Sequence, residues 1–150
     1  MDKEDPLSWD SEPYEDFLDS HFFYRAVHKN LWIKWPDLNK IYPNFFTFEQ
    51  AINGLSVDWS KYATPEFTLK SRKNPELTTN GIVELNVGKI KNAIEDQSLS
   101  LTIKHDPIKI SPFNRAHTIL EGMGRINKSK IAIKLSEIAQ WASKMMPIKT

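Results

Sequence analysis

Residues 81–90 have the sequence Gly-Ile-Val-Glu-Leu-Asn-Val-Gly-Lys-Ile, and most of this stretch alternates between apolar and polar side chains. Val83 and Leu85 fall on one side of an extended chain. The polar residues Glu84 and Asn86 fall on the other side. Because successive side chains of a strand point to opposite faces of a sheet, this stretch predicts a strand with one buried face.

A second alternating stretch covers residues 99–104, where leucine and isoleucine are separated by polar residues. The polar residues 91–98 between the two stretches have the length of a hairpin connection, so we expect the two strands to pair antiparallel. Aromatic and β-branched residues at 22–27, and the sequence Leu-Ser-Val-Asp-Trp at 55–59, predict two further short strands.

One short helix is predicted from its boundary residues. Thr64, Pro65 and Glu66 supply a capping hydroxyl, a proline for the first helical position and an acid near the positive end of the helix dipole. This short helix should end before residues 74–75, Asn-Pro.

The apolar residues near the C-terminus are spaced by 4, 3, 4 and 3 positions: Ile131, Leu135, Ile138, Ala142 and Met145. This spacing predicts an amphipathic helix of about 16 residues that ends before Pro147. We therefore predict an α+β fold: a small, mostly antiparallel sheet with short helices and a long C-terminal amphipathic helix packed on one face.

Length and charge give the expected domain organisation. A chain of 150 residues, 40% of them hydrophobic, can form one packed domain. The first 20 residues carry eight acidic groups against one lysine, whereas residues 104–150 carry nine Lys and Arg against three acids. We expect residues 1–13 to be an acidic, flexible leader and residues 14–150 to form a single α+β domain.

Several classes of protein are excluded by the composition. The chain has no cysteine, which excludes disulfides, thiolate metal sites and a cysteine nucleophile. Its apolar runs are far shorter than the roughly 20 residues that a membrane-spanning helix needs. The acidic N-terminus does not resemble a signal or transit peptide. We therefore expect a cytoplasmic protein with no membrane association.

The stretch His-Asp-Pro-Ile-Lys-Ile-Ser-Pro-Phe-Asn-Arg-Ala-His-Thr, residues 105–118, holds two of the four histidines and follows a predicted strand. Loops held between rigid elements often carry binding and catalytic groups. We expect one site formed by polar groups of this stretch and of the two upstream strands: Arg25, Asp58, His105, Asn114, Arg115 and His117.

Two interpretations of the histidines remain open. His105 and His117 could act as acid and base in phosphoryl transfer, with Arg115 or Arg25 holding the phosphate. Alternatively, His105 belongs to a turn and His117 bonds a main-chain carbonyl.

Arg25 likewise either forms a structural ion pair with Asp58 or Glu84, or binds a ligand phosphate or carboxylate. No motif completes a metal, phosphate-loop or serine-nucleophile site, because His-x-x-x-His, glycine-rich phosphate loops and G-x-S-x-G are missing. We expect no metal and no cofactor.

Aromatic residues interleaved with lysines occupy residues 29–48. They could stack on nucleic-acid bases, form a patch for a protein partner, or fill the core. We expect a larger protein partner, and nucleic acid is a possible second partner.

The order of Tyr-Arg at 24–25, Ser-Val-Asp at 56–58, His-Asp-Pro at 105–107 and Asn-Arg-Ala-His at 114–117 resembles small uncharacterised bacterial proteins of about this length. The resemblance covers most of residues 22–122 and implies no established activity. It suggests an accessory component of a bacterial defence or toxin-type system.

The sequence thus favours a small interaction module that binds a larger protein. The alternative is a metal-independent nucleic-acid or nucleotide processing enzyme that uses two histidines and an arginine.

Overall fold

The computed structural model describes residues 5–49, 52–122 and 128–150. Within these residues the chain forms one six-stranded antiparallel sheet in the order β4-β5-β2-β1-β3-β6. The strands are β1 (Phe22–His28), β2 (Gly54–Trp59), β3 (Asn80–Asn86), β4 (Leu101–His105), β5 (His117–Gly122) and β6 (Gln140–Trp141). The predicted α+β class and the mostly antiparallel sheet are confirmed.

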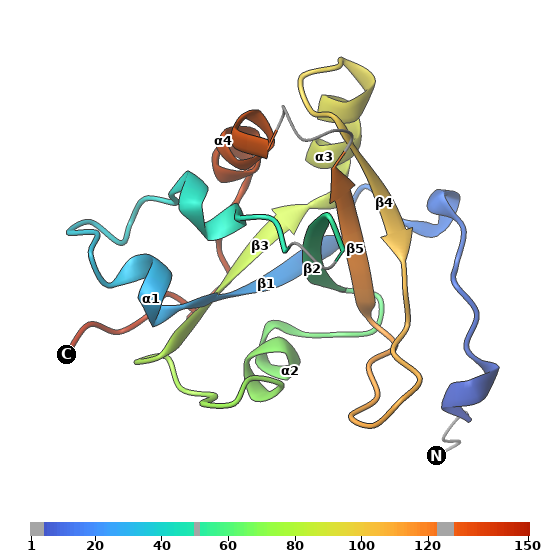
Figure 1. Ribbon diagram of the computed structural model, residues 1–150, viewed down its shortest axis with the longest axis horizontal. Helices are drawn as coiled ribbons and strands as arrows, with labels where there is room; N and C mark the ends of the chain where they lie inside the picture. The colour runs from blue at the N-terminus through green and yellow to red at the C-terminus, as the bar shows by residue number, and fades with distance from the viewer. Residues whose placement is uncertain (1–4, 50–51, 123–127) are drawn as a thin grey trace.

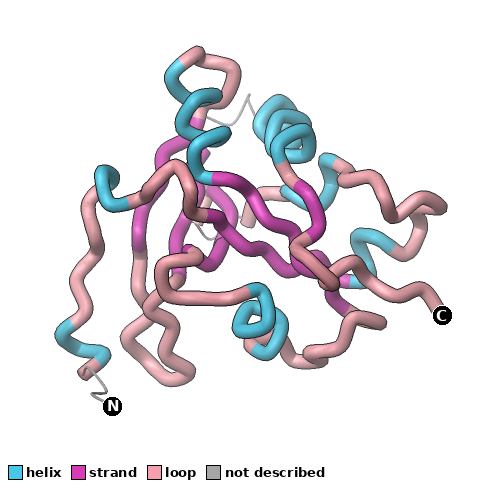
Figure 2. The backbone as a smooth tube through the Cα atoms, turned by 180° about the vertical axis from the view of Figure 1, so that it is seen from behind, coloured by secondary structure: helices cyan, strands magenta, loops and turns pink. Residues whose placement is uncertain are grey.

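Helices cover both faces of this sheet. The α-helices are α1 (Lys29–Trp32), α2 (Pro65–Lys70), α3 (Val87–Glu95) and α4 (Lys128–Ile138). Three short 3₁₀ helices are η1 (Pro6–Ser8), η2 (Tyr14–Asp16) and η3 (Pro43–Phe46). Figure 1 shows α3 and α4 on one face of the sheet and α2 on the other, and Figure 2 shows the same arrangement from behind.

The predicted hairpin between residues 81–90 and 99–104 is wrong. Residues 87–95 form helix α3, which begins where the Asn86 side chain accepts a hydrogen bond from the Lys89 amide. Strand β3 pairs with β1 and β6, and β4 pairs with β5. The alternation in each strand was a local property, but its pairing partner came from distant parts of the chain.

The predicted long C-terminal helix is also wrong. Helix α4 has 11 residues and ends at Ile138, and residues 140–141 then add an edge strand to β3. The Trp141 indole donates a hydrogen bond to the main-chain oxygen of Leu38, and the Ala142 amide donates to Ile82. The edge strand β6 and the turn after it therefore bury Ala142, which a longer helix would have placed on its apolar face.

The sheet has one closed face and one partly open face. Helices α3 and α4 cover the closed face (Figure 1). Five side chains of this face are at most 2% exposed: Phe23, Val57, Leu85, Leu101 and Leu120. The register pairs His105 with Thr118 and Val57 with Thr118, so these residues share the closed face. Asp58 pairs with His117, and both lie on the open face.

The N-terminal residues 5–13 run along the β4 edge of the sheet (Figure 1). The Glu12 amide donates to Nδ1 of His105 at 2.9 Å, and the Glu12 carboxylate lies 2.6 Å from the Lys61 ammonium group. The Tyr62 hydroxyl also donates to this carboxylate. The part of the acidic segment around Glu12 therefore contacts the body directly, and the domain boundary at residue 13 stays a prediction.

Candidate functional site

A pocket opens on the partly open face where strands β1 and β2 separate. Their ladder of described residues pairs Phe23 with Trp59 and Tyr24 with Asp58, and continues no further. The space beside the ladder's end is a cavity of about 270 Å³, which we call the Arg25 pocket. Its main polar lining comes from both strands, the residue Glu49 before β2, the segment after α2, the segment 106–116 and β5: Arg25, Glu49, Ser56, Asp58, Arg72, Asn114 and His117.

Arg25 fills the gap between the two strands. Its Nε donates to the main-chain oxygen of Phe45 at 3.1 Å, and its Nη1 donates to the main-chain oxygen of Ser56 at 3.0 Å. Nη1 also lies 3.7 Å from the Glu49 carboxylate. The ion pair predicted with Asp58 or Glu84 is therefore replaced by one with Glu49.

Arg25 is a buried cation with charges of both signs nearby. Burial lowers its pKa, Glu49 opposes this effect, and the nearby charge of Arg72 lowers the pKa further. A guanidinium group nevertheless stays protonated in proteins. Nε and Nη1 donate to the main-chain oxygens of Phe45 and Ser56, and the Glu49 side chain is a third partner of the guanidinium group.

Asp58 forms a structural connection in the wall of the pocket. The side chain is 7% exposed, and its two oxygens accept hydrogen bonds from the Thr68 hydroxyl at 2.7 Å and from the Asn114 amide at 2.8 Å. The Asn114 side-chain oxygen in turn accepts a hydrogen bond from the Ala116 amide at 3.0 Å. Asp58 therefore connects β2 to helix α2 and to the segment 106–116.

His117 lies in the same pocket with both ring nitrogens engaged. Nδ1 donates to the main-chain oxygen of Asp106 at 2.8 Å, and the Asp106 carboxylate lies 3.4 Å from the same nitrogen. Nε2 lies 3.1 Å from the Ser56 hydroxyl. Sequence reasoning missed Ser56, although it occupies the same side of its strand as Asp58.

His105 lies on the closed face, away from this pocket. It is 1% exposed, and its ring packs against Trp59 and Tyr62, with centroids 5.2 and 6.0 Å away. Nδ1 accepts from Glu12, and Nε2 donates to the main-chain oxygen of Arg115 at 2.6 Å. The two histidines point to opposite sides of the sheet, so the predicted two-histidine centre is not formed.

Arg115 also falls outside the pocket lining. Its guanidinium carbon lies 4.4 Å from the Tyr62 ring centroid and 5.8 Å from the Trp9 ring centroid. The structure thus brings four of the six predicted site residues together in the Arg25 pocket. The other two, His105 and Arg115, lie outside it. The gathered residues are Arg25, Asp58, Asn114 and His117.

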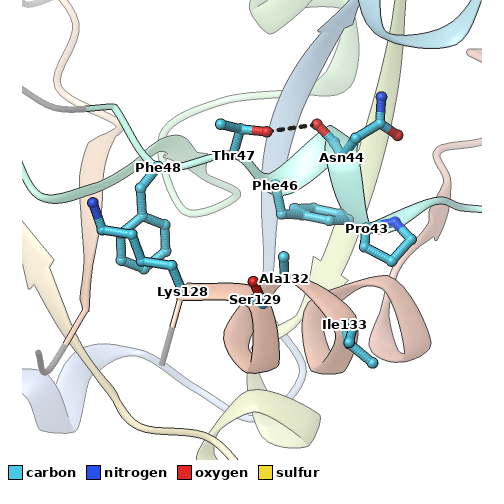
Figure 3. A pocket seen from close by; sticks show the side chains of 9 residues that line it. All are labelled: Pro43, Asn44, Phe46, Thr47, Phe48, Lys128, Ser129, Ala132 and Ile133. Atoms are coloured by element: carbon cyan, nitrogen blue, oxygen red, sulfur yellow. Dashed lines mark hydrogen bonds between the residues drawn. The ribbon is translucent and has the colours of Figure 1, made fainter. Parts of the chain in front are cut away.

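A larger cavity of about 530 Å³ lies between η3 and α4 (Figure 3). Phe46 and Phe48 face the Ala132 side of the helix across it, and the Lys128 ammonium group lies 5.8 Å from the Phe48 ring centroid. Its lining includes no carboxylate and no histidine, so the larger cavity lacks the acid–base groups of the Arg25 pocket.

The aromatic residues of the segment 29–48 mainly fill the core. Trp32, Phe45 and Phe46 are fully buried. Trp35 is stacked on Tyr42, with ring centroids 4.0 Å apart and an interplanar angle of 4°. The predicted aromatic docking or base-stacking surface is therefore largely used for internal packing.

The described residues contain neither a metal-binding cluster nor a membrane-spanning helix. Among them, no group of three or more His, Asp or Glu side chains is arranged to hold a metal ion. None of the helices in the described ranges has the length and hydropathy to cross a bilayer.

Comparisons with protein-family models, curated proteins and solved structures found no match. The resemblance to small bacterial proteins stays an expectation.

Proposed function

We propose that this protein binds a small ligand through an anionic group, a phosphate or a carboxylate, in the Arg25 pocket. The supporting observation is that two guanidinium groups, from β1 and from the end of α2, line one small cavity. Burial lowers the pKa of Arg25, Glu49 raises it, and the charge of Arg72 lowers it further. An anion between these groups relieves their repulsion and accepts charge-assisted hydrogen bonds.

The other lining groups suit a ligand that also carries hydroxyl or carbonyl groups. Ser56, Asn114 and His117 add hydrogen-bonding side chains beside the two arginines. A phosphate ester such as a nucleotide has this combination of groups. The alternative drawn from the sequence was a nucleic-acid or nucleotide processing enzyme with two histidines and an arginine. The present proposal retains the nucleotide as a possible ligand, but only one histidine, His117, lines the pocket.

The test is a titration of the protein with inorganic phosphate, acetate and adenosine monophosphate, followed by amide chemical shifts. We expect saturable shifts at residues of the Arg25 pocket. Arg72→Ala should weaken phosphate binding about 10-fold, because a hydrogen bond to a charged group contributes roughly 1.5–3 kcal/mol.

Lys73→Ala is the matched control, because it removes one positive charge from the next residue, which does not line the pocket. It should leave binding unchanged. Equal weakening by both variants would indicate non-specific attraction, and the absence of saturable shifts for all three anions would contradict the proposal.

A second candidate function is the binding of a larger protein partner, as the sequence favours. The supporting observation is the exposed apolar surface of the segment 106–116. Ile110 is 80% exposed, Phe113 50% and Ile108 36%, and Ile108 also borders the Arg25 pocket. Exposed apolar patches often mark interaction surfaces.

The test compares proteins recovered from a lysate of the producing cells with wild type, Ile110→Asp and the control Ile133→Asp, an exposed position on α4. Loss of one recovered protein with Ile110→Asp alone supports this surface, and identical recovery for all three contradicts it. The placement in a bacterial defence or toxin-type system depends on the identity of that partner.

A further inference from the structure

Ser56 and His117 line the Arg25 pocket, and the Asp106 carboxylate lies behind the His117 ring, outside the lining. The Ser56 hydroxyl lies 3.1 Å from Nε2 of His117, and the Asp106 carboxylate lies 3.4 Å from Nδ1 of the same ring. The three residues come from β2, β5 and the segment that follows β4. A nucleophile, a base and a group that orients the base have this arrangement in serine hydrolases on unrelated folds.

The main chain determines which nitrogen of His117 carries the proton. Nδ1 faces the carbonyl oxygen of Asp106 at 2.8 Å, and a carbonyl oxygen can only accept. In the neutral ring the proton is therefore on Nδ1, and Nε2 is an acceptor. The Ser56 hydroxyl consequently donates to Nε2, which is the direction that general-base activation requires.

Arg25 adds a positive group beside the hydroxyl. Its Nη1 donates to the main-chain oxygen of Ser56 at 3.0 Å, so the guanidinium group is fixed next to this residue. The Glu49 carboxylate lies at the same place, because it accepts a hydrogen bond from the Ser56 amide at 2.6 Å and lies 3.7 Å from Arg25 Nη1. A substrate oxygen that takes negative charge near Ser56 would have to displace this carboxylate to reach Arg25. Fixed donors of this kind stabilise oxyanionic transition states.

We propose that Ser56 is a nucleophile activated by His117, and that the pocket hydrolyses a small carboxylic ester. Asp106 is a positioning residue, because its main-chain oxygen and its carboxylate both lie beside Nδ1 of His117, whereas Ser56 lies beside Nε2. The preference for an ester with an anionic substituent rests on the proposed function, in which Arg72 helps to hold that substituent.

The reaction balances without a further reactant besides water. Ser56 Oγ bonds the carbonyl carbon while its proton moves to Nε2 of His117, and the carbonyl oxygen takes the negative charge. The bond to the leaving oxygen then breaks, and Nε2 returns the proton to form the alcohol. Water repeats the sequence on the acyl-serine, which releases the carboxylic acid and restores the serine hydroxyl.

A small fluorophosphonate probe tests the nucleophile directly, because it bonds activated serines with loss of fluoride. We expect mass spectrometry of the digested protein to place the label on Ser56. Ser56→Ala should abolish this label, and His117→Gln should slow labelling about 100-fold or more through loss of the general base. Unfolding curves of each variant establish that it is folded.

Ser71→Ala is the matched control within the same pocket, because the Ser71 hydroxyl donates to the main-chain oxygen of Phe67 in α2. It should label at the wild-type rate. For Asp106, Ala should slow labelling and Glu should restore it, whereas the urea midpoint of both variants stays near that of wild type.

A folded wild-type protein that takes no label on Ser56, or labels equally fast in His117→Gln, overturns the proposal. Phosphate binding distinguishes this failure from that of the proposed function. If the protein binds phosphate but Ser56 takes no label, the proposal of a nucleophile is wrong and the proposed anion binding stands. If Ser56 is labelled but the protein binds no phosphate, the proposed anion binding is wrong and the proposal of a nucleophile stands.

Discussion

His105 and His117 lie on adjacent strands of one sheet, yet their surroundings differ in almost every respect. His105 is 1% exposed and is held between the main chain of Glu12 and that of Arg115. The side chain of His117 is 15% exposed and lines a cavity, where its Nε2 forms a hydrogen bond with the Ser56 hydroxyl. A one-residue offset in register separates the two, since His105 is paired with Thr118 and not with His117.

This difference shows what separates a structural histidine from a candidate functional one. When main-chain groups engage both nitrogens in a closed interior, the ring acts as a polar component of the core. When one nitrogen meets a side-chain hydroxyl at a cavity, the ring can move a proton. The following predictions test this contrast between the closed and the open face.

The largest expected effect is on stability when the closed-face histidine is removed. His105→Ala leaves a cavity beside Trp59 and removes the partners of two partly buried main-chain groups, so the free energy of unfolding should fall by about 3 kcal/mol. Urea unfolding measures this loss. A loss no larger than that of His117→Gln would contradict the contrast.

Asp58 tests whether the pocket wall is structural. Asp58→Ala removes the acceptor for Thr68 and Asn114, so we expect a loss of about 2 kcal/mol in the free energy of unfolding. Thr68→Val, which removes one of the two donors, should cost about half as much. If Asp58→Ala is as stable as wild type, Asp58 is not a structural connection, and its carboxylate becomes available for another role.

Acid should weaken the attachment of the N-terminal segment to the closed face. Burial raises the pKa of Glu12, but hydrogen bonds from Lys61 and Tyr62 and the nearby charges outweigh it, so the pKa lies below the ordinary value of 4.5. A carboxyl whose pKa is lowered by folding stabilises the fold above its ordinary pKa, and this contribution is lost as the pH falls through the folded value.

Urea unfolding of wild type and Glu12→Gln at about pH 6.5 and about pH 3.5 checks this expectation. The difference between the two proteins should be about 1 kcal/mol or less at the higher pH and should shrink at the lower pH. A difference that grows in acid would reverse the assigned sign.

The smallest effect on stability should come from the open-face histidine. His117→Gln keeps a polar side chain at a partly exposed position, so we expect a change in the free energy of unfolding within about 0.5 kcal/mol. The same variant should slow labelling of Ser56 strongly. A large stability loss together with unchanged labelling would make His117 the structural histidine.

Local patterns predicted most strands correctly but not their partners. The alternation at residues 81–90 indicated β3, although residues 87–90 belong to α3, and the alternation at 99–104 indicated β4, because side-chain periodicity in a strand is a local property. The pairing of these strands depends on contacts with β1 and β5, which lie far away in the chain. Helix α3, with its Asn86 cap, occupies the place of the expected hairpin connection.

The candidate site was likewise predicted only in part. Arg25, Asp58, Asn114 and His117 were identified because polar residues among strand and loop residues require partners. Ser56 carried the same signal, since it shares a strand face with Asp58, but a serine at mid-strand matches no nucleophile motif. His105 and Arg115 could not be separated from the site without the register of β4 against β5.

The amino-acid sequence by itself determined the α+β class, the strand-forming segments of β1 to β4 and the cap of helix α2, where the Thr64 side chain accepts from the Phe67 amide. These features depend on residues a few positions apart. The tertiary structure alone decided which strands are neighbours, where β1 and β2 separate, and that Ser56 meets His117 across 61 positions of the chain. Such contacts depend on how distant segments bury their apolar faces together, which no local pattern specifies.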